Sequence, residues 1–301
     1  VITFLISVFT FLLVHMLPGD PTVSILGPND TPAARAELLR QLGLNKGLLA
    51  QYGTWITNVF HGNLGQSFLT KQTVTNALSV AVPIDLELIV VSQIMALVVA
   101  IPLAMVAALR PNRLFDRVST TVTFGMLALP TFVAGPLLVL ALAVQVHAFP
   151  ATGFDRLSSG FGDNLNSVIL PSICLAIGSV AVYYRLLRAD LIATLQEDFV
   201  TMARAKGLST RYILTRHALR PSSFTLLAGA GITIGGLFTG TFVVEILFAM
   251  PGIAYQLVQS IYSDDYLMVQ GMALVAAVAF VVINFAVDFL LTLLDPRVRR
   301  G

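Results

Sequence analysis

The sequence predicts an all-α integral membrane protein with six transmembrane helices, a structured extracytoplasmic segment and a cytoplasmic loop that contains short helices. Three observations support this class. Of the 301 residues, 56% are hydrophobic and only 11% are charged, against about 25% charged in an ordinary soluble domain. The mean hydropathy is +0.84. The apolar residues also fall into long runs, and Lys and Arg concentrate in alternate connections between them. A water-soluble globular protein is therefore excluded.

Six apolar runs are candidates for the transmembrane helices, because a helix needs about 20 mostly apolar residues to cross a bilayer. They are Val1–Leu17, Ala81–Leu109, Val118–Val146, Val168–Leu187, Ser223–Met250 and Leu267–Leu294. The first run is short and begins with Val rather than Met, so we expect its start to be trimmed. No small-residue cleavage site follows this run, which favours a retained helix over a signal peptide.

The positive charges predict that both termini are cytoplasmic. Connections 110–117, 185–221 and 297–300 contain 13 of the 18 Lys and Arg residues, whereas 18–80, 147–167 and 251–266 contain five. Cytoplasmic loops are enriched in Lys and Arg. We therefore expect a division into transmembrane helix 1 (residues 1–17), an extracytoplasmic segment (18–80) and a core (81–301) that includes an inward loop at 188–221.

The extracytoplasmic segment contains the signals of two helices. Thr31 and Pro32 suit the N-cap and first turn of one helix, and Gly43 suits its end. The second has apolar and aromatic residues at helical spacing, namely Leu48, Leu49, Tyr52, Trp55, Ile56 and Val59. Its Trp and Tyr predict a position along the membrane interface.

The inward loop predicts two short helices. Thr194 to Glu197 matches a capping box, Gly207 suits a helix end, and Ser209 suits the N-cap of a second helix. One face of the first helix carries Phe199, Met202, Ala203 and Lys206. An apolar helix face on a cytoplasmic loop needs a cover. The cover is either a partner protein or the inner leaflet of the membrane, on which Arg204, Lys206 and Arg211 would hold the helix.

Several chemistries lack support in the sequence. The dipeptide Gly-Lys is absent, which excludes an ATP site of the GxxxxGK[ST] type, and no GxSxG nucleophile is present. The four histidines are scattered, and the single cysteine, Cys174, lies in an apolar run and is interpreted as packing. We therefore expect no catalytic residue, metal, cofactor or nucleic-acid partner. The glycine pairs Gly231/Gly235 and Gly236/Gly240 indicate close helix packing rather than a dinucleotide loop.

Two carboxylates, Glu245 and Asp288, fall inside predicted transmembrane helices. Acids within a membrane are costly to bury and often functional. Both lie towards helix ends, so either a role in transport or coupling, or helix packing and hydrogen bonding, accounts for them. Prolines at 102, 130, 136 and 171 interrupt three of the helices, as they do where backbone lines a cavity or packs on protein.

The inward loop and three other stretches carry a family resemblance. Residues 197–209 read EDFVTMARAKGLS and residues 216–220 read RHALR. Together they resemble the cytoplasmic EAA loop of permease subunits of ATP-binding-cassette importers, in the dipeptide, oligopeptide and nickel branch, closest to the dipeptide permease B type. Further matches are HMLPGDP at 15–21, GNLGQS at 62–67, and a closing run from Val243 through Pro251, Gly271 and Asp288 to Arg297.

The resemblance implies a bacterial cytoplasmic-membrane permease that imports short peptides by alternating access. Its implied partners are a second homologous permease, two ATPase subunits and an extracytoplasmic binding protein. The implied coupling helix, which docks on an ATPase, carries Phe199, Thr201, Met202, Ala203, Arg204, Lys206 and Gly207. Two departures are Thr201-Met202-Ala203 in place of Glu-Ala-Ala, and Pro221, which is expected to shorten the following helix.

Two alternatives remain open on the sequence. One is a secondary transporter driven by protons through Glu245 and Asp288. The other is the same importer architecture with nickel or another small cargo, because the separate binding protein largely chooses the cargo in such systems.

Overall fold

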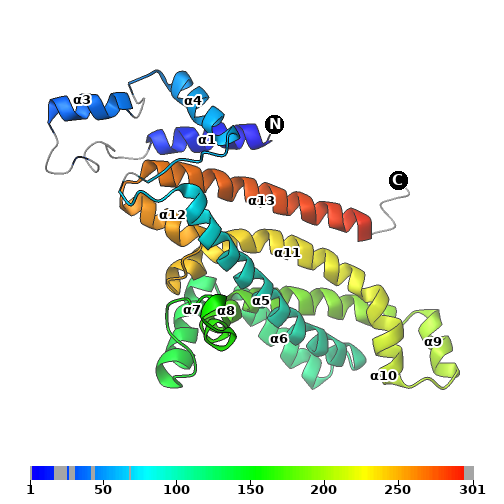
Figure 1. The fold of residues 1–301 in the computed structure, drawn as a ribbon. Helices are drawn as coiled ribbons and strands as arrows, with labels where there is room; N and C mark the ends of the chain where they lie inside the picture. The colour runs from blue at the N-terminus through cyan, green and yellow to red at the C-terminus, as the bar shows by residue number, and fades with distance from the viewer. Residues whose placement is uncertain (1, 17–25, 27–30, 42–44, 68, 295–301) are drawn as a thin grey trace. The chain divides into compact units, whose positions relative to one another are not determined.

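The computed structural model describes residues 2–16, 26, 31–41, 45–67 and 69–294 (Figure 1). Within this part of the chain, regular structure is helical, apart from one isolated antiparallel bridge between Gln66 and Thr73. The predicted all-α class is confirmed. The chain divides into two compact units, formed by residues 1–85 with 251–282 and by residues 86–250 with 283–301.

The helices of the first unit are α1 (Ile2–Met16), α3 (Pro32–Gln41), α4 (Leu48–Phe60), the start of α5 (Val74–Leu109), α12 (Ile253–Tyr262) and the start of α13 (Tyr266–Leu294). The second unit contains the rest of α5 and α13, with α6 (Leu114–Ala128), α7 (Thr131–Leu138), the π-helix η2 (Val139–Gln145), the 3-10 turn η3 (Leu157–Ser159), α8 (Phe161–Thr194), α9 (Asp198–Ala205), α10 (Thr210–Tyr212), the π-helix η4 (Ile213–Ala218) and α11 (Leu219–Leu247).

The predicted count of six transmembrane helices is not confirmed. Among the described residues, four stretches are long and apolar enough to span a bilayer: Val74–Leu109, Phe161–Thr194, Thr210–Phe238 and Tyr266–Val287. The run 118–146 is not one straight helix, because α6 and the α7–η2 segment meet at 106°. This break falls at Pro130, which lacks the N–H that would continue the helix. If this bent pair is one span, the number rises to five. The described part of the first run forms α1.

Both helices predicted between residues 18 and 80 are present in the first unit. The hydroxyl of Thr31 accepts a hydrogen bond from the N–H of Ala34 at 3.2 Å and so caps α3; Gly43 lies outside the described residues. Helix α4 has no buried residue, yet the rings of Tyr52 and Trp55 pack on Phe11 of α1, with centroids 5.4 and 5.8 Å away. Helix α5 begins at Val74, inside the stretch predicted as extracytoplasmic.

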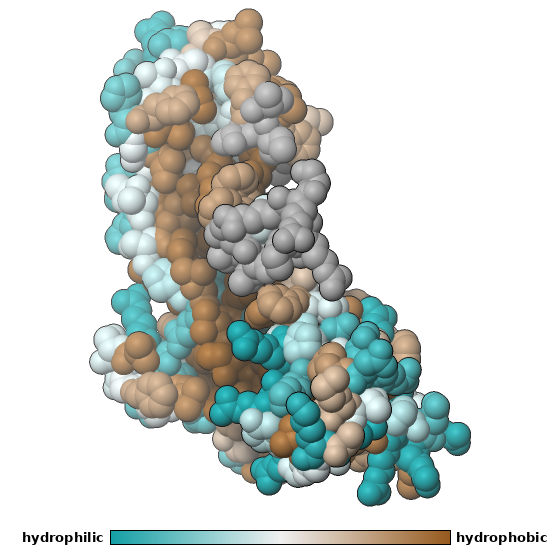
Figure 2. Space-filling model, turned by 90° about the vertical axis from the view of Figure 1, so that its right-hand side faces the viewer, coloured by the Kyte–Doolittle hydropathy of each residue, from teal (hydrophilic) through white to brown (hydrophobic). Residues whose placement is uncertain are grey.

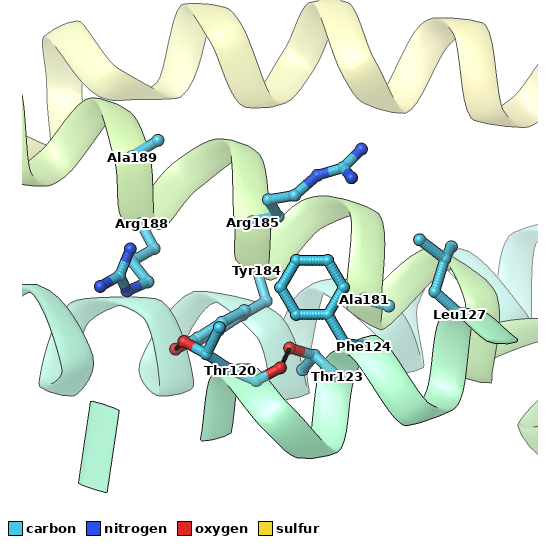
Figure 3. Close-up of a pocket in the computed structure, with 9 residues that line it drawn as sticks. All are labelled: Thr120, Thr123, Phe124, Leu127, Ala181, Tyr184, Arg185, Arg188 and Ala189. Atoms are coloured by element: carbon cyan, nitrogen blue, oxygen red, sulfur yellow. Dashed lines mark hydrogen bonds between the residues drawn. The ribbon is translucent and has the colours of Figure 1, made fainter. Parts of the chain in front are cut away.

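The second unit is built around α8, which lies between α6 and α11 (Figures 1 and 3). Its core joins the α8 side chains Tyr183, Tyr184, Leu187 and Leu191 to a stripe of alanines on α5, namely Ala96, Ala100, Ala104, Ala107 and Ala108. Small residues let helices approach closely within a membrane. The opposite face of α5 exposes Leu86, Val90, Ile94 and Val98 at intervals of four residues, which gives the helix a side suited to lipid or to another membrane protein.

Glycines set two close approaches of α11. A Cβ on Gly229 would lie 2.3 Å from Cδ1 of Leu186 on α8, and one on Gly235 would lie 2.6 Å from Oδ1 of Asn284 on α13. A Cβ on Gly236 would meet nothing within 4 Å. Helix α11 therefore packs closely on α8 at Gly229 and on α13 at Gly235, and is open at Gly236.

Candidate functional site

The inward loop leaves α8, forms α9 and returns through α10 and η4 into α11, at one end of the second unit (Figure 1). The predicted capping box is wrong, because Thr194 is the last residue of α8 rather than an N-cap. Its hydroxyl instead lies 3.1 Å from that of Ser222 on α11. Glu197, with extended backbone, is the N-cap of α9, and its side chain makes no capping hydrogen bond.

The C-terminus of α9 is closed by a Schellman motif. Gly207 has a φ of 79°, a left-handed conformation that glycine adopts without steric cost. The N–H of Gly207 donates to the carbonyl of Arg204 at 2.9 Å, and the N–H of Leu208 donates to that of Ala203 at 3.2 Å. Both hydrogen bonds satisfy carbonyls that would otherwise be free at the helix end. The predicted helix end at Gly207 is confirmed, as is the predicted cap at Ser209, which accepts from the N–H of Tyr212.

The side chains of α9 divide differently from the single apolar face that we predicted. Val200 and Ala203 are buried in a small cluster with Ile213 of η4, because α9 folds back on the segment that leads into α11. Phe199 and Met202 point away from this cluster and are 43% and 60% exposed.

The remaining residues of the predicted coupling set are exposed, namely Thr201, Arg204, Lys206 and Gly207. Figure 2, which looks onto the end that carries α9 and α10, shows mostly hydrophilic residues with isolated apolar ones over its lower part.

Pro221 does not shorten the helix as we expected. Thr210 to Leu247 is continuous helix, in which η4 immediately precedes α11. Proline removes the hydrogen bond to the carbonyl four residues earlier, which here belongs to His217 within η4. The helix nevertheless continues through Pro221, three residues after the end of the π-helix.

A second group of polar residues joins α6 to α8 in the second unit. Arg188 donates through Nε to Oδ1 of Asp116 and through Nη2 to Oδ2 of the same carboxylate. The Nη2–Oδ2 distance is 2.6 Å. Asp116 also accepts from the N–H of Asn112 at 2.7 Å. The hydroxyl of Tyr184 lies 2.7 Å from that of Ser119. These contacts connect the α5–α6 turn, α6 and α8 at a single point.

Beside this group, α6 and α8 enclose a pocket of about 160 Å³ (Figure 3). It is lined by Thr120, Thr123, Phe124, Leu127, Ala181, Tyr184, Arg185, Arg188 and Ala189. In Figure 3, Arg188 reaches towards α6, whereas the guanidinium of Arg185 points away from it. Most of the walls are apolar, so the polar contacts of this region belong to the ion pair and the hydroxyls beside it.

Family comparison identifies the chain. The sequence model of the family described as binding-protein-dependent transport system inner membrane component matches residues 100–300, and the N-terminal model of the same kind of component matches residues 1–89. The chain belongs to this permease family. The resemblance read from the inward loop is thereby confirmed, and the permease is an inner membrane component of a transport system.

Relatives match the permease over nearly its full length. The oligopeptide transport system permease protein AppB of Bacillus subtilis is 32% identical, with 97% of this chain and 94% of the relative covered. The glutathione transport system permease protein GsiC of Escherichia coli is 34% identical, with 98% and 94% covered. The nickel import system permease protein NikB of Staphylococcus aureus is 35% identical, with 99% and 88% covered.

Two solved structures share the fold of the permease. A chain of the MetNI methionine ABC transporter in inward-facing conformations gives a TM-score of 0.55 at 16% identity, covering 72% of this chain and 96% of that one. A chain of an amino acid ABC transporter gives 0.51 at 16% identity, covering 82% and 98%. At this identity the likeness supports the fold alone.

The other predicted site residues of the permease lie on α11 and α13. Glu245 is fully buried near the end of α11. Asp288 lies on α13, and its side chain is outside the described part of the structure. Gly231 and Gly235 lie on α11, where Gly235 contacts Asn284.

Sequence reasoning missed the Asp116–Arg188 ion pair. In the sequence, Arg113, Arg117 and Arg188 serve only as positive charges that predict the orientation, and Asp116 has no predicted role. The available signal was a carboxylate between two arginines just before the predicted transmembrane run 118–146, because a carboxylate beside such a run tends to be paired.

Proposed function

We propose that this permease is the membrane subunit of an ATP-driven importer of short peptides in a bacterial cytoplasmic membrane. The observation that carries the proposal is α9: a short, capped helix on the inward loop that exposes Phe199 and Met202 while Val200 anchors it. The names of relatives, which include oligopeptide and glutathione permeases, support a peptide cargo.

Helix α9 is proposed to dock on a separate ATPase subunit. Two large apolar side chains in an otherwise hydrophilic setting are suited to a groove on another protein. Arg204 and Lys206 lie on the same short segment and are exposed, so they are available to acidic groups at the groove rim. The inner leaflet is the competing cover for this surface, but a helix firmly joined to both α8 and α11 suits the transmission of force.

The mechanism proposed is alternating access. ATP-driven closure of two ATPases would move the coupling helices, and the pathway between this chain and a second homologous permease would open to one side at a time. A binding protein would deliver the peptide to the outward segment 18–80. Both termini of the chain are proposed to be cytoplasmic.

Two other readings compete with a peptide importer. A nickel cargo is favoured by the similarity to a nickel import permease. A proton-driven secondary transporter would use Glu245 and Asp288. Glu245, on α11, is fully buried, which is compatible with that role.

Co-purification tests the proposed assembly. The tagged permease, expressed with the other subunits of its transport system, should recover a second permease and the ATPases, whereas the subunit expressed alone should be unstable or inactive. Matched variants sharpen the test: Phe199→Ser with Met202→Ser should lose the ATPases and keep the second permease. Retention of the ATPases by this double variant would remove α9 as their docking site.

A further inference from the structure

We infer that the Asp116–Arg188 ion pair carries movement of the inward loop into α6, so that both residues are positioning residues for transport. The inference rests on the proposed function, because it assumes that an ATPase moves α9. Nothing in the family assignment requires such a pair, and neither residue lies in the motif stretches 197–209 and 216–220.

The path from α9 to the pair is short and helical. Helix α8 runs without interruption from Phe161 to Thr194, and α9 follows after three residues. Arg188 stands six residues before the end of α8, which corresponds to about 9 Å along the axis. A displacement of α9 therefore reaches Arg188 through less than two turns of regular helix.

Other contacts fix the same end of α8 to α11. The hydroxyls of Thr194 and Ser222 are 3.1 Å apart, and Thr225 donates to Oδ2 of Asp190 at 3.3 Å. Leu214 and Ala218 of η4 and Leu226 of α11 are also buried in one cluster with Leu187 and Leu191 of α8. Because of this apolar packing, the loop, α8 and α11 are expected to move as one body at this end. Without a strong link, α6 would contact this body mainly through apolar side chains and a few hydroxyls, across which helices can slide.

The ion pair supplies that link. Arg188 uses two nitrogens for the two oxygens of Asp116, and such a bidentate arrangement fixes direction as well as distance. The side chain of Arg188 is 23% exposed and that of Asp116 is 3% exposed, so water competes weakly for the carboxylate. Asp116 also holds the N–H of Asn112, whose φ is 64°. Pulling on Arg188 therefore moves the α5–α6 turn together with α6.

Asp116 lies at the end of α6 that is opposite to its sharp bend. It lies in the first turn of α6, and the far end of α6 is the 106° break at Pro130. A helix held at one end and bent sharply at the other transmits a tilt to the bend. The ion pair thus connects the inward loop to the broken part of the predicted third span.

The test compares Arg188→Gln, Arg188→Lys and the control Arg117→Gln in the assembled transporter. Arg117 is exposed on the same turn of α6, so its variant removes one arginine without touching the pair. We expect Arg188→Gln to keep ATP hydrolysis and to lower peptide transported per ATP by about tenfold, within the range of known coupling energies. Arg188→Lys should restore part of the loss, and Arg117→Gln should match the wild type.

A distance measurement separates transmission from mere stability. Spin labels are placed at the exposed positions Thr121 on α6 and Gln196 on the loop, in a Cys174→Ala background. The distance between the two labels should be the same without nucleotide and with ATP and vanadate. In Arg188→Gln this distance should change between the two states. An unchanged distance with normal transport per ATP would overturn the inference alone. If the unmodified transporter shows no nucleotide-dependent transport, the proposed function fails and the inference with it.

Discussion

The N–H of Leu208 reaches back to the carbonyl of Ala203 at 3.2 Å, and this hydrogen bond closes α9. It forms because Gly207, between the two residues, has a φ of 79°. The same geometry directs the chain from α9 towards Ser209 and the cap of α10. The direction of α9 on the loop therefore depends on one backbone conformation.

Replacing Gly207 with Val should uncouple transport from ATP hydrolysis. A β-branched residue in a left-handed conformation costs on the order of 1 kcal/mol or more, and the last turn of α9 would rearrange to avoid it. Insertion into the membrane should be unchanged. The measurement is peptide uptake per ATP hydrolysed in proteoliposomes. Ala205→Val, which adds the same side chain at an exposed helical position, is the control, and normal coupling by Gly207→Val would count against the assignment.

The two faces of α9 should respond differently to substitution. Phe199→Ser leaves the fold intact because the side chain is 43% exposed, whereas Val200 is fully buried against Ile213. We expect Phe199→Ser to weaken ATPase binding without a change in thermal stability. Val200→Ala should lower the free energy of unfolding of the loop by about 2 kcal/mol. Binding measured by co-purification and stability measured by limited proteolysis separate the two effects, and equal loss of both in either variant would contradict this division.

Gly271 on α13 should tolerate no side chain. A Cβ at this position would lie 2.7 Å from the carbonyl oxygen of Leu64 and 2.8 Å from both Cγ atoms of Val74. A backbone carbonyl cannot move aside cheaply, so Gly271→Ala should reduce stability by about 1–3 kcal/mol. Gly236→Ala, whose Cβ would meet nothing within 4 Å, should be neutral or stabilising. Thermal unfolding of the two variants in detergent makes the comparison, and equal melting temperatures would show that the GNLGQS loop does not pack on α13 as described.

Local signals in the sequence predicted much of this structure, and tertiary contacts explain where they failed. Thr31, Gly207 and Ser209 act through hydrogen bonds to nearby backbone, so their roles could be predicted without the fold. Thr194 matches a capping pattern equally well, but it does not begin a helix. Helix α8 continues as far as Thr194 because its apolar side is packed up to Leu191. The ion pair joins residues 72 positions apart, and neither residue reveals its partner locally.

The proposed topology predicts opposite labelling of Lys71 and Lys206. Both are exposed, and the proposed orientation places Lys71, with Trp55, outside and Lys206 inside. Single cysteines at positions 55, 71 and 206 in a Cys174→Ala background should react accordingly with a membrane-impermeant thiol reagent in sealed cells. Reaction at position 206 from outside would overturn the orientation.

Peptide uptake into proteoliposomes tests the central claim most directly. Vesicles that contain both permeases and the ATPases, supplied with the binding protein, should take up peptide with ATP and continue when a protonophore collapses the proton gradient. Vesicles with this chain alone should take up none. Uptake by this chain alone, driven by a proton gradient and abolished by Glu245→Gln, would contradict the account and establish a secondary transporter.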